Sequence, residues 1–280
     1  MNTLELINAG SSRLKSNNIF THKLDSELLL SEVLKKTREE ILINLNAKMS
    51  QIDILKFKNL INRRAKKEPI AYILKYKEFW SKKFQIDKST LIPRPETELM
   101  IEYLINIFKR KKINILDIGT GSGCILISLL AELINSKGIG VDISEKALII
   151  ANKNVLNHKL SNKVKLLNRS FEKIYDKKFD LIVSNPPYIK TSDIKNLAED
   201  VRNFEPKIAL DGGNDGLDLI KKVIYKSTYI LKLDGLLALE IGNNQYKKVS
   251  NLLIRNKFKI VKKVKDYRDN IRCLVSKLIK

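Results

Sequence analysis

Apolar residues recur at helical spacing through the N-terminal part of the chain. Between residues 3 and 67 they repeat every three or four positions, with one such set from Leu28 to Leu34 and another from Ile52 to Ile61. Ser50 stands where its side chain can cap the N-terminus of the second of these helices. The pattern therefore predicts a small helical bundle over this part of the chain.

Aromatic residues crowd the next, partly alternating stretch, between residues 69 and 90. They are Tyr72, Tyr76, Phe79, Trp80 and Phe84. Aromatic side chains favour strands, and the short spacing predicts a hairpin that links two domains. We expect these rings to form a core at the domain junction rather than a cofactor site.

Beyond residue 90 the pattern alternates between strands and helices. Strands are predicted at 113–117, 138–142, 163–167, 179–184, 236–241, 258–265 and 271–278, and helices at 99–108, 124–134, 145–157, 216–232 and 244–256. Such alternation is typical of a parallel sheet with helices on both faces. The last two strands are joined by a short polar turn at 266–270, so one of them should run antiparallel. The sequence thus predicts an α/β fold with a helical domain at 1–74, a hairpin linker at 75–90 and a Rossmann-like, seven-stranded domain at 91–280.

Composition narrows the class of protein. The 280 residues are 44% hydrophobic and 30% charged, as in ordinary soluble proteins. No run approaches the ~18 uncharged apolar residues of a membrane span, and the first residues lack the apolar core of a signal peptide. We therefore expect a cytoplasmic protein without membrane contact.

Cysteine and histidine are too sparse for a disulfide framework or a metal site. Cys124 and Cys273 form no C-x-x-C pair, and His22 and His158 are isolated from one another along the chain. The net charge of +22 favours an anionic partner such as RNA. Because lysine is spread along the chain without a dense block, a compositional bias explains the charge equally well.

A glycine-rich loop, Gly119-Thr120-Gly121-Ser122-Gly123, lies between the strand ending at Ile118 and the helix beginning at Cys124. Such a loop lets a ligand press against bare backbone at the positive end of a helix. Its G-x-G-x-G spacing differs from the G-x-G-x-x-G fingerprint of dinucleotide-binding proteins, which argues against a bound pyrophosphate.

Asp142 ends the following strand, about 20 residues beyond the glycines, which is the separation at which a carboxylate reaches a ribose diol. Asp142 could instead cap the helix that begins near Glu145. Together, the loop and the carboxylate indicate a ligand that contains a nucleoside.

The segment Asn185-Pro186-Pro187-Tyr188 directly follows the apolar strand 179–184. Two prolines stop the strand and stiffen the loop, so its carbonyl groups point in fixed directions. The Asn185 side-chain oxygen and the Pro186 carbonyl can then hold a planar amino group. On its own the segment could be a simple proline-rich turn. It ends at the same sheet edge as the glycine loop and Asp142, however, which favours group transfer from a nucleoside cofactor to an NH2.

The chain resembles the class I S-adenosylmethionine-dependent methyltransferases. More narrowly, it is similar to the family that methylates the glutamine of the Gly-Gly-Gln motif in class-1 peptide chain release factors. Besides the helical N-terminal domain, the matching segments are Leu91–Glu98, Asp117–Gly123, Gly140–Asp142, Val183–Ile189, Phe204–Pro206 through Asp211–Gly213, and Asp266–Asn270. N-P-P-Y is shared with amino methyltransferases of nucleic acids, whereas R-P-E-T-E and F-E-P are more restrictive.

The resemblance implies a role for each matching residue. Asn185, Pro186 and Tyr188 would form the catalytic set, and S-adenosyl-L-methionine would contact Gly119, Thr120, Gly121, Ser122, Gly123, Asp142, Phe171 and Asn185. The substrate would meet Asn185, Pro186, Pro187, Tyr188, Arg94 and Glu96. The helical domain would recognise the substrate, and no metal is expected.

One segment departs from the family pattern. An acidic residue followed by an aromatic usually lies beside the adenine, whereas this chain has Ser170 before Phe171. Phe171 is therefore the better candidate for the adenine contact, and a weaker cofactor affinity is one possible result.

Two alternative functions are compatible with the same site residues. The first is an amino methyltransferase acting on an exocyclic NH2 of adenine or guanine in RNA or DNA, with the positive charge contacting phosphates. The second is a non-catalytic RNA-binding protein on a methyltransferase fold. The favoured prediction is a monomer that modifies release factors and contacts RNA only weakly.

Overall fold

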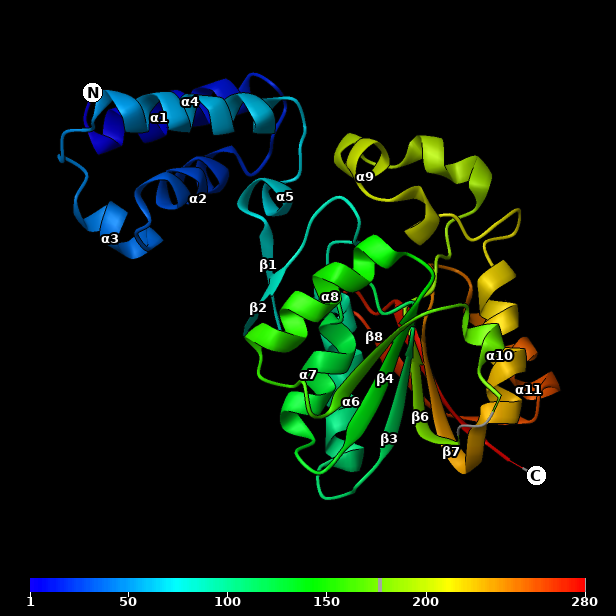
Figure 1. The fold of residues 1–280 in the computed structure, drawn as a ribbon. Coiled ribbons are helices and arrows are strands. Elements are labelled where there is room, and N and C mark those ends of the chain that lie inside the picture. Colours follow the sequence, from blue (N-terminus) through cyan, green and yellow to red (C-terminus); the bar gives the residue numbers. More distant parts are fainter. Residues whose placement is uncertain (176–177, 280) are drawn as a thin grey trace. The chain divides into compact units, whose positions relative to one another are not determined.

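The computed structural model describes residues 1–175 and 178–279, and the chain forms two compact units (Figure 1). The first unit contains Met1–Lys75 and Ala198–Phe204, and the second contains Tyr76–Leu197 and Glu205–Lys280.

The first unit is helical. Its elements are α1 (Thr3–Lys15), α2 (His22–Leu34), α3 (Arg38–Ile43), α4 (Gln51–Ala65), α5 (Ile70–Leu74) and α9 (Glu199–Phe204). Leu14, Leu29 and Phe57 are buried in its core, as the helical spacing predicts. The predicted cap is confirmed, because the Ser50 hydroxyl accepts a hydrogen bond from the backbone N–H of Asp53 at 3.1 Å. The apolar pattern does not predict the short α9.

A two-stranded hairpin begins the second unit. It consists of β1 (Tyr76–Phe79) and β2 (Lys82–Gln85), which pair antiparallel. Trp80 and Ser81 both have φ of 51°, as a two-residue turn of type I′ requires. Phe79 and Phe84 were expected at a domain junction. The structure places both in the core of the second unit, with ring centroids 6.0 Å apart.

The second unit is built on a seven-stranded sheet with the order β5-β4-β3-β6-β7-β9-β8. Its strands are β3 (Asn114–Ile118), β4 (Lys137–Asp142), β5 (Val164–Asn168), β6 (Phe179–Ser184), β7 (Leu231–Glu240), β8 (Phe258–Lys265) and β9 (Ile271–Leu278). β3 to β7 are parallel, and β9 runs antiparallel to both of its neighbours, which confirms the predicted antiparallel strand. The strand order reverses between β3 and β6, so ligand binding is expected at their carboxyl ends.

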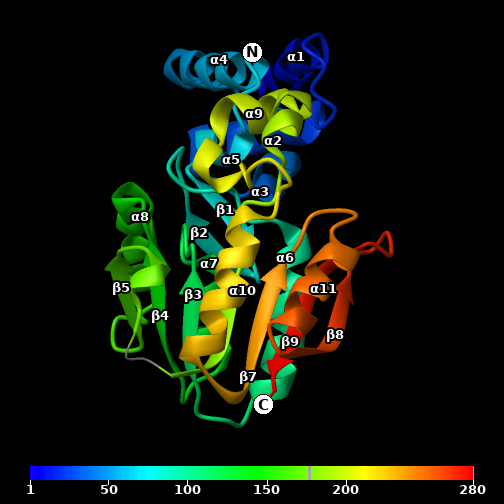
Figure 2. The ribbon, with the colours of Figure 1, turned by 90° about the vertical axis from the view of Figure 1, so that its right-hand side faces the viewer.

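Helices cover both faces of this sheet (Figure 2). One buried cluster joins the sheet to α6 (Pro95–Phe108), α7 (Cys124–Glu132) and α8 (Glu145–Asn157), and another joins it to α10 (Asp218–Ile230) and α11 (Tyr246–Arg255). Within the described ranges, no helix combines the length and the apolar character that a bilayer-spanning segment needs.

Most predicted boundaries agree with the structure to within two residues, but α6 begins at Pro95 rather than at 99, and β7 begins at Leu231 rather than at 236. Leu231 pairs with Phe179 before an irregularity in the β6–β7 ladder, and Asp234 has φ of 65°. The pair Asp234-Gly235 lies inside the strand, although its sequence is typical of a turn. The apolar pattern therefore predicts a strand that begins only after this pair.

β8 lies at one edge of the sheet. Lys259, Lys262, Lys263 and Lys265 are exposed along it, with Val264 buried between them. Charged side chains of this kind discourage pairing of a free strand edge with another chain.

Candidate active site

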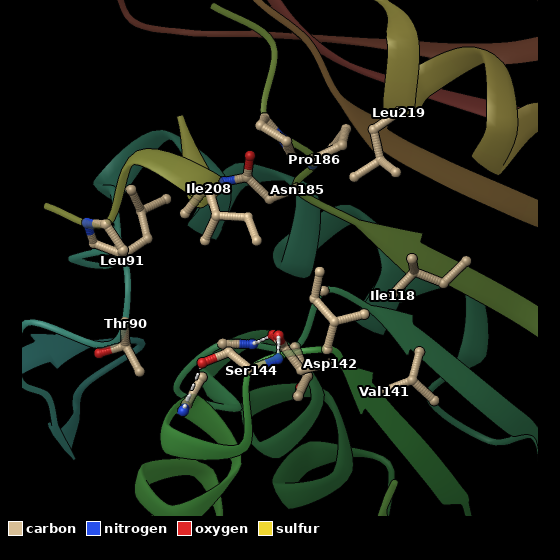
Figure 3. A pocket seen from close by; sticks show the side chains of 18 of the residues that line it. Thr90, Leu91, Ile118, Val141, Asp142, Ser144, Asn185, Pro186, Ile208 and Leu219 are labelled. Atoms are coloured by element: carbon tan, nitrogen blue, oxygen red, sulfur yellow. Dashed lines mark hydrogen bonds between the residues drawn. The ribbon is translucent and has the colours of Figure 1, made fainter. Parts of the chain in front are cut away.

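A cavity of about 760 Å³ lies at the carboxyl ends of β3, β4 and β6, within the second unit (Figure 3). Asn185 and Pro186 lie on one side of it, and Asp142 and Ser144 lie on the other. Its lining also includes Thr90, Leu91, Arg94, Gly119, Thr120, Gly121, Ser122, Phe171, Pro187 and the segment 206–209. The structure thus brings most of the predicted site residues into one cavity.

The glycine loop forms one wall of the cavity. Gly119, Gly121 and Gly123 have φ of 71°, 55° and 80°, in the left-handed region that favours glycine. The N–H groups of Gly119 and Thr120 both donate to the Val141 carbonyl, at 2.9 and 3.0 Å, which fixes the loop to the end of β4. Gly123 lies outside the lining, because it packs toward Ile127 and α8 and begins α7.

Asp117 lies beneath this loop at the end of β3 and is almost fully buried. Its Oδ2 accepts a hydrogen bond from the Thr120 hydroxyl at 2.7 Å, whereas Oδ1 has no partner in the described part of the chain. Burial, together with repulsion from Asp142, raises the pKa of Asp117 to about 7. No role was predicted for this residue, although an acid two positions before a glycine loop at a strand end is a signal that could have indicated one.

Asp142 holds the glycine loop and faces the cavity. Its Oδ2 accepts from the Gly121 N–H and its Oδ1 from the Ser144 N–H, both at 2.9 Å. The helix-cap alternative is wrong, because Ser144 caps α8 by accepting from the Ala147 N–H. Each carboxylate oxygen keeps a further lone pair, so Asp142 can still accept hydrogen bonds from a diol.

The segment after β5 also reaches the cavity. Phe171 is 7% exposed and lines it beside Ser170 and Glu172. Ser170 begins a short 3₁₀ helix, Phe171–Lys173, and its hydroxyl donates to the Glu172 carboxylate at 3.1 Å. An acidic side chain, that of Glu172, therefore lies at this wall two positions after Ser170.

The Asn185-Pro186 acceptors are available to a ligand. Among residues 1–175 and 178–279, no group makes a hydrogen bond to the Asn185 carboxamide or to the Pro186 carbonyl. Both residues line the cavity, as does Pro187. A partly buried amide without a partner gains hydrogen bonds when a polar ligand binds.

Tyr188 and Glu96, both in the described part of the chain, lie outside the lining. The Tyr188 hydroxyl instead donates to Glu240 Oε1 at 3.3 Å, and burial raises the pKa of the tyrosine well above its usual value. Glu96 lies in the first turn of α6, half-buried. Glu240 was not predicted to belong to the site, because its partners are distant in sequence.

Arg94 lines the cavity on the side of segment 206–209. Its Nη2 donates to Glu205 Oε1 at 2.6 Å, and the other Glu205 oxygen accepts from the Ile92 N–H at 3.2 Å. The R-P-E-T-E and F-E-P segments therefore meet at this wall.

Metal ligands do not gather in the described residues. No group of three or more histidine, cysteine or acidic side chains there is placed to hold an ion. Cys124 lies at the first position of α7, where burial raises the pKa of its thiol to about 12.

Family models match two parts of the chain. Residues 5–74 match the PrmC N-terminal domain, and residues 95–203 match the methyltransferase small domain.

Solved structures share the fold at low sequence identity. The ribosomal protein L11 methylase of Lactobacillus delbrueckii is 21% identical with a TM-score of 0.52, covering 70% of this chain and 84% of that one. The hMettl16 catalytic domain is 18% identical with a TM-score of 0.57, covering 85% and 87%. At this level of identity the likeness establishes the α/β methyltransferase fold alone.

Curated relatives are more similar. A bifunctional methyltransferase of Rickettsia typhi is 37% identical over 91% of this chain, which spans about half (53%) of that relative's length. A release factor glutamine methyltransferase of Fusobacterium nucleatum is 38% identical, covering 98% of this chain and 78% of the relative. One from Buchnera aphidicola is 40% identical, covering 90% and 91%. The chain therefore belongs to the release factor glutamine methyltransferase family.

Proposed function

We propose that this protein transfers a methyl group from S-adenosyl-L-methionine to the side-chain amide nitrogen of the glutamine in the Gly-Gly-Gln motif of class-1 release factors. The observation that carries the proposal is a pair of acceptors, Asn185 Oδ1 and the Pro186 carbonyl, which receive no hydrogen bond from the described residues and line the same cavity as the glycine loop. Family membership supplies the substrate class.

The residues present fit the cofactor. The bare backbone of Gly119 and Gly121 suits close contact with its methionine part, and the Asp142 carboxylate suits its ribose hydroxyls. Phe171 offers an apolar face for the adenine. When bound, S-adenosyl-L-methionine supplies an electrophilic methyl group.

The chain's own contribution is to hold the amide nitrogen. A carboxamide nitrogen is a poor nucleophile because its lone pair is delocalised into the carbonyl. Two fixed acceptors can bind its two hydrogens and favour a pyramidal nitrogen, whose positive charge develops only in the transition state. The two prolines keep these acceptors in place before the substrate arrives, so little reorganisation is needed.

We also propose roles for the domains and for the partners of the protein. The helical residues 1–74 bind the release factor, the linker 75–90 connects them to the methyltransferase domain 91–280, and the protein acts as a monomer in the cytoplasm. Contact with RNA is weak and secondary, since the +22 charge is spread over the whole chain.

The experiment compares three acceptors. The purified protein and isotopically labelled cofactor are incubated with a release factor, with the same factor carrying Gly-Gly-Glu, and with stripped RNA or DNA. We expect label only in the Gly-Gly-Gln factor, and mass spectrometry places it on the glutamine amide. Label in adenine or guanine instead would establish the nucleic-acid amino methyltransferase, and the absence of cofactor binding by calorimetry would favour the non-catalytic protein.

A further inference from the structure

Tyr188 is held at its hydroxyl by the end of β7. The hydroxyl donates to Glu240 Oε1 at 3.3 Å, and Glu240 Oε2 accepts from the Thr97 hydroxyl at 2.5 Å. Glu240 is 2% exposed, so these bonds form in surroundings where an unsatisfied carboxyl would be costly.

Tyr188 is also held at its backbone. Gln245 Nε2 donates to the Tyr188 carbonyl at 3.0 Å and to the Gly216 carbonyl at 3.1 Å. Gln245 Oε1 accepts from the Gly242 N–H at 2.8 Å, which fixes the orientation of the amide. One side chain thus joins the loop after β6 to the loop after β7.

Three glycines close the space around this residue. A methyl group on Gly212 would lie 2.7 Å from the Pro187 carbonyl oxygen, and one on Gly216 would lie 2.5 Å from that of Tyr188. One on Gly242 would lie 3.0 Å from Tyr188 Cδ2. The backbone of Pro187 and Tyr188 therefore has little room to shift.

We propose that Glu240 and Gln245 are positioning residues that hold Tyr188 from two ends and so keep Asn185 and Pro186 fixed at the cavity wall. The proposal rests on the proposed function. Neither residue lines the cavity, so neither acts directly on a ligand. Glu240 also bonds Thr97, which does line the cavity, so Tyr188→Phe is the variant that isolates the link to Tyr188. Fixed acceptors stabilise developing charge without reorganisation, and a displacement of about 1 Å can lower a rate about 100-fold.

The test uses the full chain with Gln245→Ala, Glu240→Ala, Glu240→Gln and Tyr188→Phe, and with the double variant Tyr188→Phe/Glu240→Ala. Asn243→Ala is the matched control, because Asn243 is exposed in the same loop and its side chain hydrogen-bonds only to Arg272 among the described residues. For each protein we measure cofactor affinity by calorimetry, single-turnover methylation of a release factor at saturating cofactor, and hydrogen exchange of peptides covering residues 185–191.

Gln245→Ala and Glu240→Ala should lower the single-turnover rate by about tenfold to 100-fold, with cofactor affinity unchanged within a factor of about two. Exchange of the 185–191 peptides should become faster, whereas Asn243→Ala should match the parent protein. Glu240→Gln should recover most of the rate, because its amide can still bond both hydroxyls. Tyr188→Phe should add no further loss to Glu240→Ala, since both remove the same link.

Unchanged exchange of 185–191 together with a parental rate in Gln245→Ala and Glu240→Ala would overturn the inference, as would additive losses in the Tyr188→Phe double variant. If an alanine variant does not fold, Tyr188→Phe and Glu240→Gln test the same link, because they alter fewer atoms of the side chain. An unmodified release factor with the parent protein would refute the proposed function instead, while the exchange measurement still decides whether Tyr188 is held in this way.

Discussion

The Arg94 guanidinium donates to the Glu205 carboxylate across 2.6 Å, although 111 positions separate the two residues in the chain. Glu205 also accepts from the Ile92 N–H, so one buried carboxylate fixes both the backbone before α6 and a side chain at the cavity wall. Two of the most family-specific segments therefore form a single wall of the site.

Arg94→Ala should lower the free energy of unfolding by about 1 to 3 kcal/mol, because a charge-assisted hydrogen bond to a buried carboxylate is lost. Chemical denaturation measures this change. Arg110→Ala, at an exposed position after α6, is the control and should have little effect. Equal stability of the two variants would show that the pair contributes nothing measurable.

Asn185→Ala should reduce single-turnover methylation by about 100-fold to 1,000-fold, the usual loss when one preorganised polar group is removed from a transition-state site. Cofactor affinity should change far less, because Asp142 lies on the opposite side of the cavity, where its carboxylate holds the Gly121 N–H. Rapid-quench kinetics and calorimetry separate the two effects. Near-normal methylation by this variant would remove Asn185 from the mechanism.

Asp142→Ala should weaken cofactor binding by about tenfold to 100-fold, as expected for the loss of a hydrogen bond to a charged group. Its carboxylate also accepts from the Gly121 and Ser144 N–H groups, so the loop should become less ordered as well. Calorimetry with Glu145→Gln, at an exposed position in the first turn of α8, provides the comparison. A cofactor affinity equal to that of the control would exclude a role for Asp142 in binding.

Asp117→Asn should stabilise the cofactor-free protein at pH 8. Because burial raises the folded-state pKa to about 7, the folded state keeps a proton between about pH 4 and pH 7 that the unfolded chain has released. The contribution of Asp117 to the free energy of unfolding therefore falls by on the order of 4 kcal/mol as the pH rises from about 4 to about 7. Urea denaturation of both proteins from pH 5 to pH 8 measures the difference, which should be largest at pH 8 and shrink toward low pH. Asp193→Asn, at an exposed position, is the control, and its effect on the free energy of unfolding should not depend on pH in this range. If the stability difference between Asp117→Asn and the parent protein were the same at every pH, the raised pKa of Asp117 would be contradicted.

Local patterns predict those features that adjacent residues determine. The helix at 145–157 and the strands at 179–184, 258–265 and 271–278 have the predicted bounds, because each is an uninterrupted run between polar turns. The glycine loop, Asp142 and Asn185 were placed at one sheet edge by the rule that parallel strands share their carboxyl ends.

Features that depend on distant contacts could not be predicted in this way. The Tyr188–Glu240 and Arg94–Glu205 pairs join segments 52 and 111 positions apart. Nothing in the N-P-P-Y segment itself shows that its tyrosine hydroxyl lies behind the loop rather than in the cavity. Likewise, α9 and the 3₁₀ helices Thr191–Asn196 and Lys207–Ala209 are too short for apolar periodicity to indicate them.

The lysines along β8 bear on how the molecule behaves in concentrated solution. A second copy approaching this open ladder edge to edge would bring two like-charged rows together, at a cost that grows as salt is diluted. Part of the positive charge of the chain thus disfavours edge-to-edge pairing of β8 with a second copy.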